Sequence, residues 1–364
     1  MVFMKANFFK KIFYPPNYLF LPAVGLEICN GSIKYIEFNH KNGLFSVKKF
    51  GQTFLLADTI KGGSVLNKNN LVKALGEMKS KISSDFVKVS IPEEKTYIFD
   101  VKLPKEAKDN LREALEFKIE ENVPLKLEDC FFEFEIIEEK EASDHLVVNV
   151  YVVPRKVVLD YTESLIQAGI YPVAFEIESK VIANTLIPIT DNKRNFIILE
   201  IKEDSTVLIA VVNGFVRRTS VVTIGENDIR KALLKSGLFS DELISGKYFE
   251  NDFSFETIYS KESYPYLINI FSILKDETEN FNEYVNTKIL GNESDSSDKD
   301  IILCGRASLL PGLAKHINQN IKTRVTNANI FSNIPGVEGY TSKIKFNDSL
   351  DFATPVGLAI SSYK

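Results

Sequence analysis

The stretch that decides the fold is "VGLEICNGSIKYIEF", residues 24–38. It begins with an apolar run that ends at Glu27 and Ile28, and a short polar turn follows at residues 29–32. Alternating apolar and polar residues after the turn predict a second strand. Backbone N–H groups in such tight turns can converge on phosphate oxygens, provided that small residues allow a close approach. The stretch therefore predicts a β-hairpin whose turn could bind phosphate.

Two later stretches resemble this hairpin. "LEIKEDST" (199–206) is again an apolar strand ending in Glu-Ile, with a polar turn and another apolar strand after it. "LCGRASLLPG" (303–312) is a buried strand whose turn opens onto a helix. A duplicated element predicts two sheet domains that face each other with their turns at one cleft. Glu27 and Glu200 end the first strands of the two repeats, where a carboxylate can hold Mg²⁺ through water.

Residues 93–153 interrupt this pattern with a unit of their own. "KTYIFDVKLP" predicts a strand, "KEAKDNLREALEFKIEENVP" a helix, and "DCFFEFEIIEE" and "HLVVNVYVVP" two further strands. This β-α-β-β unit is too small for a main domain and fits an inserted subdomain. We therefore expect four regions: an N-terminal tail (1–21), a first subdomain (22–92 and 154–195), the insertion (93–153) and a second lobe (196–364).

Composition excludes several function classes. The net charge of −5 argues against a general nucleic-acid binder, since phosphate contacts need a basic face. The three cysteines, Cys29, Cys130 and Cys304, form no CxxC or Cys/His cluster, so we expect neither a zinc site nor a disulfide framework, but a reducing cytoplasm. We expect Cys29 and Cys304 to be small buried residues of the core. No apolar run reaches the roughly 18 residues of a membrane span.

The N-terminal segment "FMKANFFKKIFYPP" (3–16) leaves two interpretations open. On a helix, its aromatic and aliphatic residues would share one face with two lysines beside it, as in a short amphipathic contact with an anionic membrane. The alternative is a tail whose aromatics pack on the protein's own surface, because a helix of about ten residues is marginal alone.

The chain resembles the PilM family, actin-like cytoplasmic proteins of type IV pilus assembly that are related to the division protein FtsA. Five stretches carry the resemblance: "VGLEICNGSIKYIE" (24–37), "EFKIEENVPLKLEDC" (116–130), "PRKVVLDYTESLIQAGIYPVAFEIESKVIA" (154–183), "LCGRASLLPGL" (303–313) and "FATPVGLAI" (352–360). It extends from about residue 20 to the C-terminus.

The resemblance implies an α/β, actin-like fold, in which ribonuclease H-like units are duplicated into two lobes around an inserted β-α-β-β subdomain. It also implies a cytoplasmic scaffold at the inner face of the cytoplasmic membrane. Such a scaffold would bind the N-terminal tail of a PilN-like membrane protein between the first subdomain and the insertion, with helix 105–122 and strands 87–103 as walls. It would link the inner-membrane complex to the pilus motor. A related type II secretion machine, self-association and peripheral membrane contact stay open.

The resemblance further implies an ATP site with Mg²⁺ at Glu27 and Glu200. Its candidate residues are Glu27, Cys29, Asn30, Gly31, Ser32, Lys34, Glu200, Lys202, Gly225, Gly305 and Arg306. Several depart from the family pattern: glutamate replaces aspartate at positions 27 and 200, and glycines are replaced by Cys29, Lys202, Glu226 and Arg306.

These departures predict weak or absent ATP binding, although Lys202 and Arg306 are cations that could still meet phosphates. An active actin-like ATPase or a sugar-kinase-like phosphotransferase is the alternative. A kinase would need an aspartate as catalytic base, and we find no convincing one.

Overall fold

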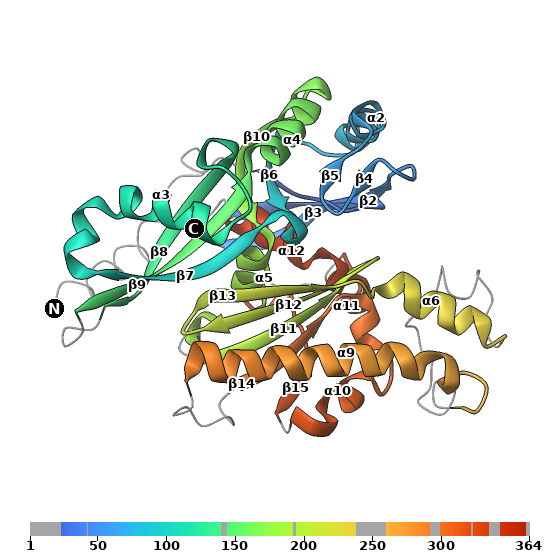
Figure 1. Cartoon of the computed structure of the whole chain (residues 1–364). Coiled ribbons are helices and arrows are strands. Elements are labelled where there is room, and N and C mark those ends of the chain that lie inside the picture. The colour runs from blue at the N-terminus through green and yellow to red at the C-terminus, as the bar shows by residue number, and fades with distance from the viewer. Residues whose placement is uncertain are drawn as a thin grey trace.

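The computed structural model describes residues 23–41, 43–139, 144–191, 194–237, 260–291, 299–321, 323–334 and 343–361. Two lobes lie one above the other, and a smaller subdomain projects from one side of the upper lobe (Figure 1). The interpretation of the N-terminal segment falls outside the described residues. Among the helices that the structure describes, none is both long and apolar enough to cross a membrane.

The first lobe is built on a five-stranded sheet with the order β10-β6-β1-β2-β3. Strands β1, β2 and β3 are antiparallel neighbours, and β6 and β10 continue the sheet in parallel. All five residues of β1 are buried, because helices cover both faces of the sheet. The elements are β1 (Val24–Ile28), β2 (Ser32–Lys41), β3 (Leu44–Phe54), β4 (Ile60–Lys61), β5 (Ser64–Val65), α2 (Lys68–Lys79), β6 (Phe86–Ile91), α4 (Arg155–Gln167), β10 (Tyr171–Ile177) and α5 (Glu178–Leu186).

The second lobe repeats this arrangement. Its sheet has the order β13-β12-β11-β14-β15, again three antiparallel strands followed by two parallel ones. Strand β12 is buried along its whole length and accordingly reads as a continuous apolar run. The repeat confirms the predicted duplication. The elements that follow α5 in the chain are β11 (Asn195–Ile201), β12 (Thr206–Val212), β13 (Phe215–Val222), α6 (Glu226–Lys235), α9 (Tyr264–Tyr284), β14 (Lys299–Cys304), α10 (Leu313–Ile321), β15 (Arg324–Asn327), α11 (Phe346–Ser349) and α12 (Ala353–Ser361).

The insertion has the predicted β-α-β-β order. It comprises β7 (Tyr97–Pro104), α3 (Leu111–Asn122), β8 (Cys130–Glu139) and β9 (His145–Pro154), with the sheet order β7-β9-β8. Helix α3 buries Leu111, Leu115 and Ile119 against apolar residues of this sheet, which gives the insertion a core of its own. The exact domain boundaries stay a prediction.

Polar contacts fasten the insertion to the rest of the molecule. Asp100 on β7 forms an ion pair with Arg217 on β13 of the second lobe, with 2.5 Å between Oδ2 and a guanidinium nitrogen. The hydroxyl oxygen of Tyr151 on β9 lies 3.5 Å from the carbonyl oxygen of Val216, which is also on β13. The insertion therefore touches both lobes.

The C-terminal helix α12 packs on the first lobe, although we expected residues 196–364 to form the second. A Cβ atom at Gly25 of β1 would lie 1.9 Å from the carbonyl oxygen of Pro355, so only glycine permits this approach. Figure 1 shows α12 beside the first-lobe strands. Helices α5 and α12 contribute to an apolar core that also holds residues of both sheets.

Candidate functional site

The turn of the first hairpin brings together the residues predicted there. The backbone N–H of Cys29 donates to the carbonyl oxygen of Ser32 over 2.8 Å and closes the turn between β1 and β2. Glu27 on β1 and Lys34 on β2 lie opposite each other in the strand pair. Both are buried, as are Cys29 and Ser32. The Sγ of Cys29 donates to Oε1 of Glu27 over 3.2 Å. Burial, followed by the charge of Glu27, raises the pKa of Cys29, so this residue is a buried thiol and not a nucleophile.

The second turn, between β11 and β12, repeats this geometry. The backbone N–H of Lys202 donates to the carbonyl oxygen of Ser205 over 2.8 Å. Glu200 is the last residue but one of β11, just as Glu27 is the last but one of β1. The two predicted metal ligands therefore occupy equivalent positions of the duplicated units.

Glu27 and Glu200 share a buried cluster with Glu178, the first residue of α5. One carboxylate oxygen from each lies within 4.8 Å of the others, a spacing that could hold a metal ion. The ammonium of Lys202 already lies among them, with Nζ 2.5 Å from Oε1 of Glu178 and 3.6 Å from Oε1 of Glu27. Burial lowers the pKa of Lys202, but the charges of Glu178 and Glu27 outweigh burial and raise it, so the ammonium stays charged. Lys202 thus supplies the positive charge that a metal would bring.

One lysine cannot neutralise three ionised carboxylates. Burial, and then the charge of Glu178, raise the pKa of Glu200 well above its usual range, which disfavours the ionised form of this carboxyl group. Its Oε2 has no hydrogen-bond partner within the described part of the chain. The pKa of Glu178 is also raised by burial, an effect that the charge of Lys202 opposes. The cluster therefore combines one cation with carboxyl groups whose ionisation burial disfavours.

Glu203 occupies the space in front of the first turn. Ser32 Oγ donates to its Oε1 over 2.7 Å, and Gln52 Nε2 donates to the same atom over 3.2 Å. Its Oε2 lies 2.6 Å from where a Cβ of Gly31 would be, so the carboxylate sits directly against the turn. An anion from the second lobe therefore already uses the donors that would face a phosphate.

The N-terminus of α6 is closed in a similar way. The backbone N–H of Glu226 donates to the carbonyl oxygen of Lys202 over 2.8 Å, and that of Asn227 donates to the carbonyl oxygen of Glu203 over 2.9 Å. A Cβ at Gly225 would lie 2.6 Å from the same Glu203 oxygen, which explains the glycine. Free N–H groups at a helix N-terminus can bind phosphate, but these two are occupied.

Arg306 is held by acids as well. Gly305 has φ of +86°, and its Cβ would lie 2.0 Å from the carbonyl oxygen of Ile201, so the third turn packs tightly on β11. The Nε of Arg306 lies 3.1 Å from Oδ2 of Asp351 and 3.9 Å from Oε1 of Glu226. Burial, together with the charge of Asp351, raises the pKa of Glu226 to about 7. Arg306 is therefore directed toward Asp351 and Glu226.

Lys34 is the last of the predicted site residues around the turns, and it also has acidic neighbours. Burial lowers the pKa of Lys34, but the charges of Asp351, Glu27 and Glu203 outweigh burial and raise it. The structure thus brings together the residues predicted around the three turns. We call Glu27, Ser32, Glu178, Glu200, Lys202 and Glu203 the interlobe site.

The interlobe site has little free volume. The cavity beside its two turns, bordered by Asn30, Lys202 and Glu203 among others, measures about 20 Å³. That volume is about enough for one water molecule, whereas pockets for nucleotide-sized ligands measure roughly 300–1,000 Å³. With Lys202 among the carboxylates and Glu203 against the first turn, the described side chains leave no space of nucleotide size at this site.

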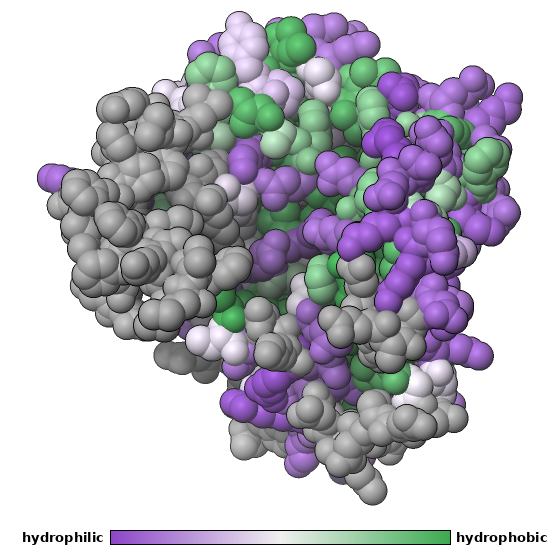
Figure 2. Space-filling view, turned by 90° about the vertical axis from the view of Figure 1, so that its left-hand side faces the viewer, coloured by the Kyte–Doolittle hydropathy of each residue, from purple (hydrophilic) through white to green (hydrophobic). Residues whose placement is uncertain are grey.

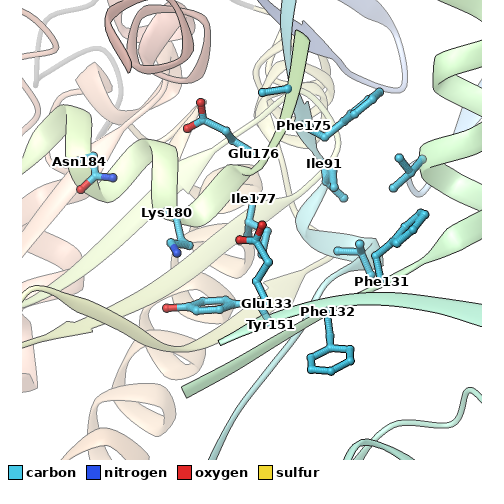
Figure 3. Close-up of a pocket in the computed structure, with 13 residues that line it drawn as sticks. Ile91, Phe131, Phe132, Glu133, Tyr151, Phe175, Glu176, Ile177, Lys180 and Asn184 are labelled. Carbon is cyan, nitrogen blue, oxygen red and sulfur yellow. The ribbon is translucent and has the colours of Figure 1, made fainter. Parts of the chain in front are cut away.

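A much larger cavity, of about 620 Å³, lies between the first subdomain and the insertion. We call it the insertion groove. Figure 3 shows apolar side chains at one side of it and polar ones at the other. Phe175 and Phe131 belong to the apolar side, Lys180 and Asn184 to the polar side, and Glu133 points between them.

Most charges at the polar side of the groove are paired. Lys180 Nζ lies 3.0 Å from Oε1 of Glu135 and 4.3 Å from the centre of the Tyr151 ring. Glu176 accepts hydrogen bonds through Oε1 from Lys88 Nζ over 3.2 Å and from Ser361 Oγ over 2.7 Å. These contacts connect the groove to α5 and to the C-terminal helix.

Two sheet edges border the insertion groove. Strand β10 is the last strand of the first-lobe sheet and β8 the last of the insertion sheet, and both contribute residues to the lining. Each has a single neighbour among the strands that the structure describes. Such edges leave backbone N–H and C=O groups free to pair with an added peptide.

The expected wall helix does not border the groove. Helix α3, within the predicted range 105–122, contributes none of the lining residues, and of strands 87–103 only Ile91 does so. The reason is that α3 buries its apolar stripe against the insertion sheet. The strand β8 therefore forms the wall that we had assigned to this helix.

Sequence reasoning also missed Glu178, Glu203 and Asp351. Glu178 follows a strand directly and starts a helix, a position typical of site residues in α/β folds. Glu203 is the neighbour of the predicted Lys202 in the same turn. No signal in the sequence points to Asp351, which reaches Arg306 from 45 residues further along the chain.

Two duplicated sheets that face each other across such turns, with an insertion in the first lobe, define an actin-like protein. Solved structures agree on this fold. The PilM–PilN type IV pilus biogenesis complex matches with a TM-score of 0.72 at 17% identity, covering 94% of this chain and 99% of the other. The ethanolamine utilization protein EutJ from Carboxydothermus hydrogenoformans matches with a TM-score of 0.52 at 12% identity, covering 98% of this chain and 97% of the other.

Residues 25–218, more than half of the 364, match the family described as type IV pilus assembly protein PilM. The chain belongs to that family. No curated protein matches it.

Proposed function

We propose that this chain is a cytoplasmic scaffold of type IV pilus assembly that binds the N-terminal tail of a PilN-like membrane protein in the insertion groove. The observation that carries the proposal is the groove itself, a cavity of about 620 Å³ bordered by two sheet edges. An extended peptide can add a strand to such an edge and place alternate side chains into a pocket, a recurrent mode of peptide recognition.

In this proposal the protein works at the inner face of the cytoplasmic membrane and is held there by its partner. Binding the tail would link the inner-membrane complex to the pilus motor. The first test is calorimetric titration of the full chain with a synthetic peptide that has the sequence of a PilN-like N-terminal tail. A micromolar or tighter Kd is expected, and absence of binding would contradict the proposal.

We further propose that the interlobe site is a degenerate ATP site. Lys202 lies where a metal would be bound and Glu203 uses the donors of the first turn, both from within the chain. Losing even two charge-assisted contacts, at about 1.5–3 kcal/mol each, weakens binding by about two to four decades. We therefore expect wild-type Kd for Mg²⁺-ATP near or above millimolar, with no turnover above background.

The comparison that tests this uses calorimetry with Mg²⁺-ATP and three proteins. One is the wild type. The second carries five restoring substitutions, and the third adds a sixth that removes the carboxylate at the first turn. The five are Glu27→Asp, Cys29→Gly, Glu200→Asp, Lys202→Gly and Arg306→Gly, and the sixth is Glu203→Ala.

Thermal unfolding verifies that each variant is folded. We expect the sixfold variant to gain the most affinity, since only it frees Ser32 from Glu203. Tight, Mg²⁺-dependent ATP binding by the wild type would contradict the proposal and favour the alternative of an active ATPase.

A further inference from the structure

We propose that Glu133 selects a cationic group on the peptide that occupies the insertion groove, either a lysine or arginine side chain or the free N-terminal ammonium. This inference rests on the proposed function, because it concerns the partner of the same groove. It adds a chemical requirement that apolar contacts with the groove would not impose.

The position of Glu133 follows from the alternation along β8. Phe132 and Phe134 contact the core under α3, so Phe131 and Glu133 point to the opposite face, toward the groove. In Figure 3 the carboxylate of Glu133 points into the middle of the cavity, beside Ile177. A peptide lying in the groove would pass directly over it.

The charges around Glu133 leave it uncompensated. Glu135, two residues along the strand, is paired with Lys180 and accepts a hydrogen bond from the Tyr151 hydroxyl over 2.9 Å. Glu176, across the groove, is paired with Lys88. Glu133 has no ion pair or side-chain hydrogen bond with any residue that the structure describes, and it is exposed.

Binding changes the surroundings of this carboxylate. In the free protein water solvates it, but a bound peptide would cover it in a partly apolar groove. A covered carboxylate without a partner is costly, whereas a charge-assisted hydrogen bond to a cation offsets that cost. Glu133 therefore favours a cationic peptide and also penalises a neutral or acidic one.

The proposed partner meets this requirement. Cytoplasmic segments within about 15–20 residues of a membrane span carry an excess of lysine and arginine. A short N-terminal tail of a single-pass membrane protein is such a segment. Charge complementarity therefore favours a membrane-protein tail over other apolar peptides of equal length.

The test measures binding of the synthetic tail peptide by fluorescence anisotropy, together with peptides in which each basic group is removed in turn. One of these is acetylated at its N-terminus, and each of the others carries one lysine or arginine changed to glutamate. The protein variants are Glu133→Gln and Glu133→Lys. The control is Glu113→Gln, an exposed glutamate on α3, outside the groove. Thermal unfolding checks that all variants fold.

We expect about a tenfold weaker Kd for Glu133→Gln, as for loss of one charge-assisted hydrogen bond, and no change for Glu113→Gln. Changing one particular basic group of the peptide should weaken binding to the wild type at least tenfold, because a glutamate there also repels Glu133, and this loss should be smaller for Glu133→Gln. If that group is a side chain, its glutamate variant should bind Glu133→Lys better than wild type. Tail binding that is insensitive to both Glu133 and every basic group overturns this inference and leaves the scaffold intact. No binding of the natural tail to wild type overturns both.

Discussion

The molecule has two clefts of opposite character. The interlobe site is bordered by ionisable side chains that neutralise one another, and its cavity measures about 20 Å³. The insertion groove measures about 620 Å³, has an apolar side, and retains one acid without a partner among the described residues. The face that carries the insertion shows apolar and hydrophilic side chains interspersed over its coloured part (Figure 2). The difference shows that side chains of the same protein can fill one cleft, here the interlobe site, while another, the insertion groove, stays open to a ligand.

The largest effect should come from Lys202→Met. This change removes the cation from three buried carboxylates, and breaking a buried ion pair in this way costs about 3–5 kcal/mol of the free energy of unfolding. Urea denaturation measures the loss. Because the carboxylate oxygens lie within 4.8 Å of one another, adding Ca²⁺ or Mg²⁺ should restore part of the stability of the variant but not change the wild type.

The matched control is Lys180→Met in the insertion groove. Lys180 is also paired with a glutamate, but both side chains are partly exposed. Such a pair is worth about 1 kcal/mol or less. An equal loss of stability in the two variants would show that the interlobe site is not held together by a buried charge.

The next effect concerns Glu93, which follows β6 between the two clefts. Its Oε2 accepts a hydrogen bond from the backbone N–H of Ser179 over 3.3 Å, and burial raises its pKa to about 7. The pKa of Glu93 in the folded protein lies above its value of 4.5 in the unfolded chain. The stability that its protonated form provides is therefore complete below about pH 4.5 and is lost as the pH rises through 7. Ionisation of Glu93 lowers the free energy of unfolding by at most about 3 kcal/mol.

Glu93→Gln should abolish this pH-dependent loss of stability, because glutamine does not ionise. We expect the variant to be more stable than wild type at pH 8 and nearly equal to it at pH 5, as measured by urea denaturation at both values. A variant whose stability differs from wild type by the same amount at both pH values would contradict the prediction.

The smallest effect is expected in the groove, and it should appear in binding. Phe131→Ala removes an aromatic side chain from the apolar side and should weaken the tail Kd by about tenfold or more. Phe117→Ala is the control, because Phe117 is 78% exposed on α3 of the same insertion and lies outside the groove. Equal losses in both variants would place the binding surface elsewhere on the insertion.

Much of the fold could be predicted because it follows from local patterns. Apolar runs and alternation fixed the two duplicated hairpins and the insertion, and the repeat placed Glu27 and Glu200 at equivalent positions. The amphipathic stripe of Leu111, Leu115 and Ile119 correctly predicted a buried helix face. It could not tell which face of which sheet covers that stripe, and α3, predicted as a groove wall, does not line the insertion groove.

The interlobe site was predictable only in part for a similar reason. The substitutions at the turns indicated a loss of nucleotide binding, but the sequence does not say where the new side chains point. Lys202 meets Glu178, and Glu203 meets Ser32, only because the lobes close on each other. Such contacts join segments far apart in the chain, and no local pattern encodes them.

Helix α12 has a consequence for how the protein is made. Strand β1 is synthesised long before α12, the helix that packs against Gly25, because all the strands of both lobes precede that helix in the chain. Until then, part of the first-lobe sheet lacks its apolar cover. Although domains generally fold in order during synthesis, the first lobe cannot complete its packing until α12 has been made. Deletion of α12 would thus uncover β1 at Gly25.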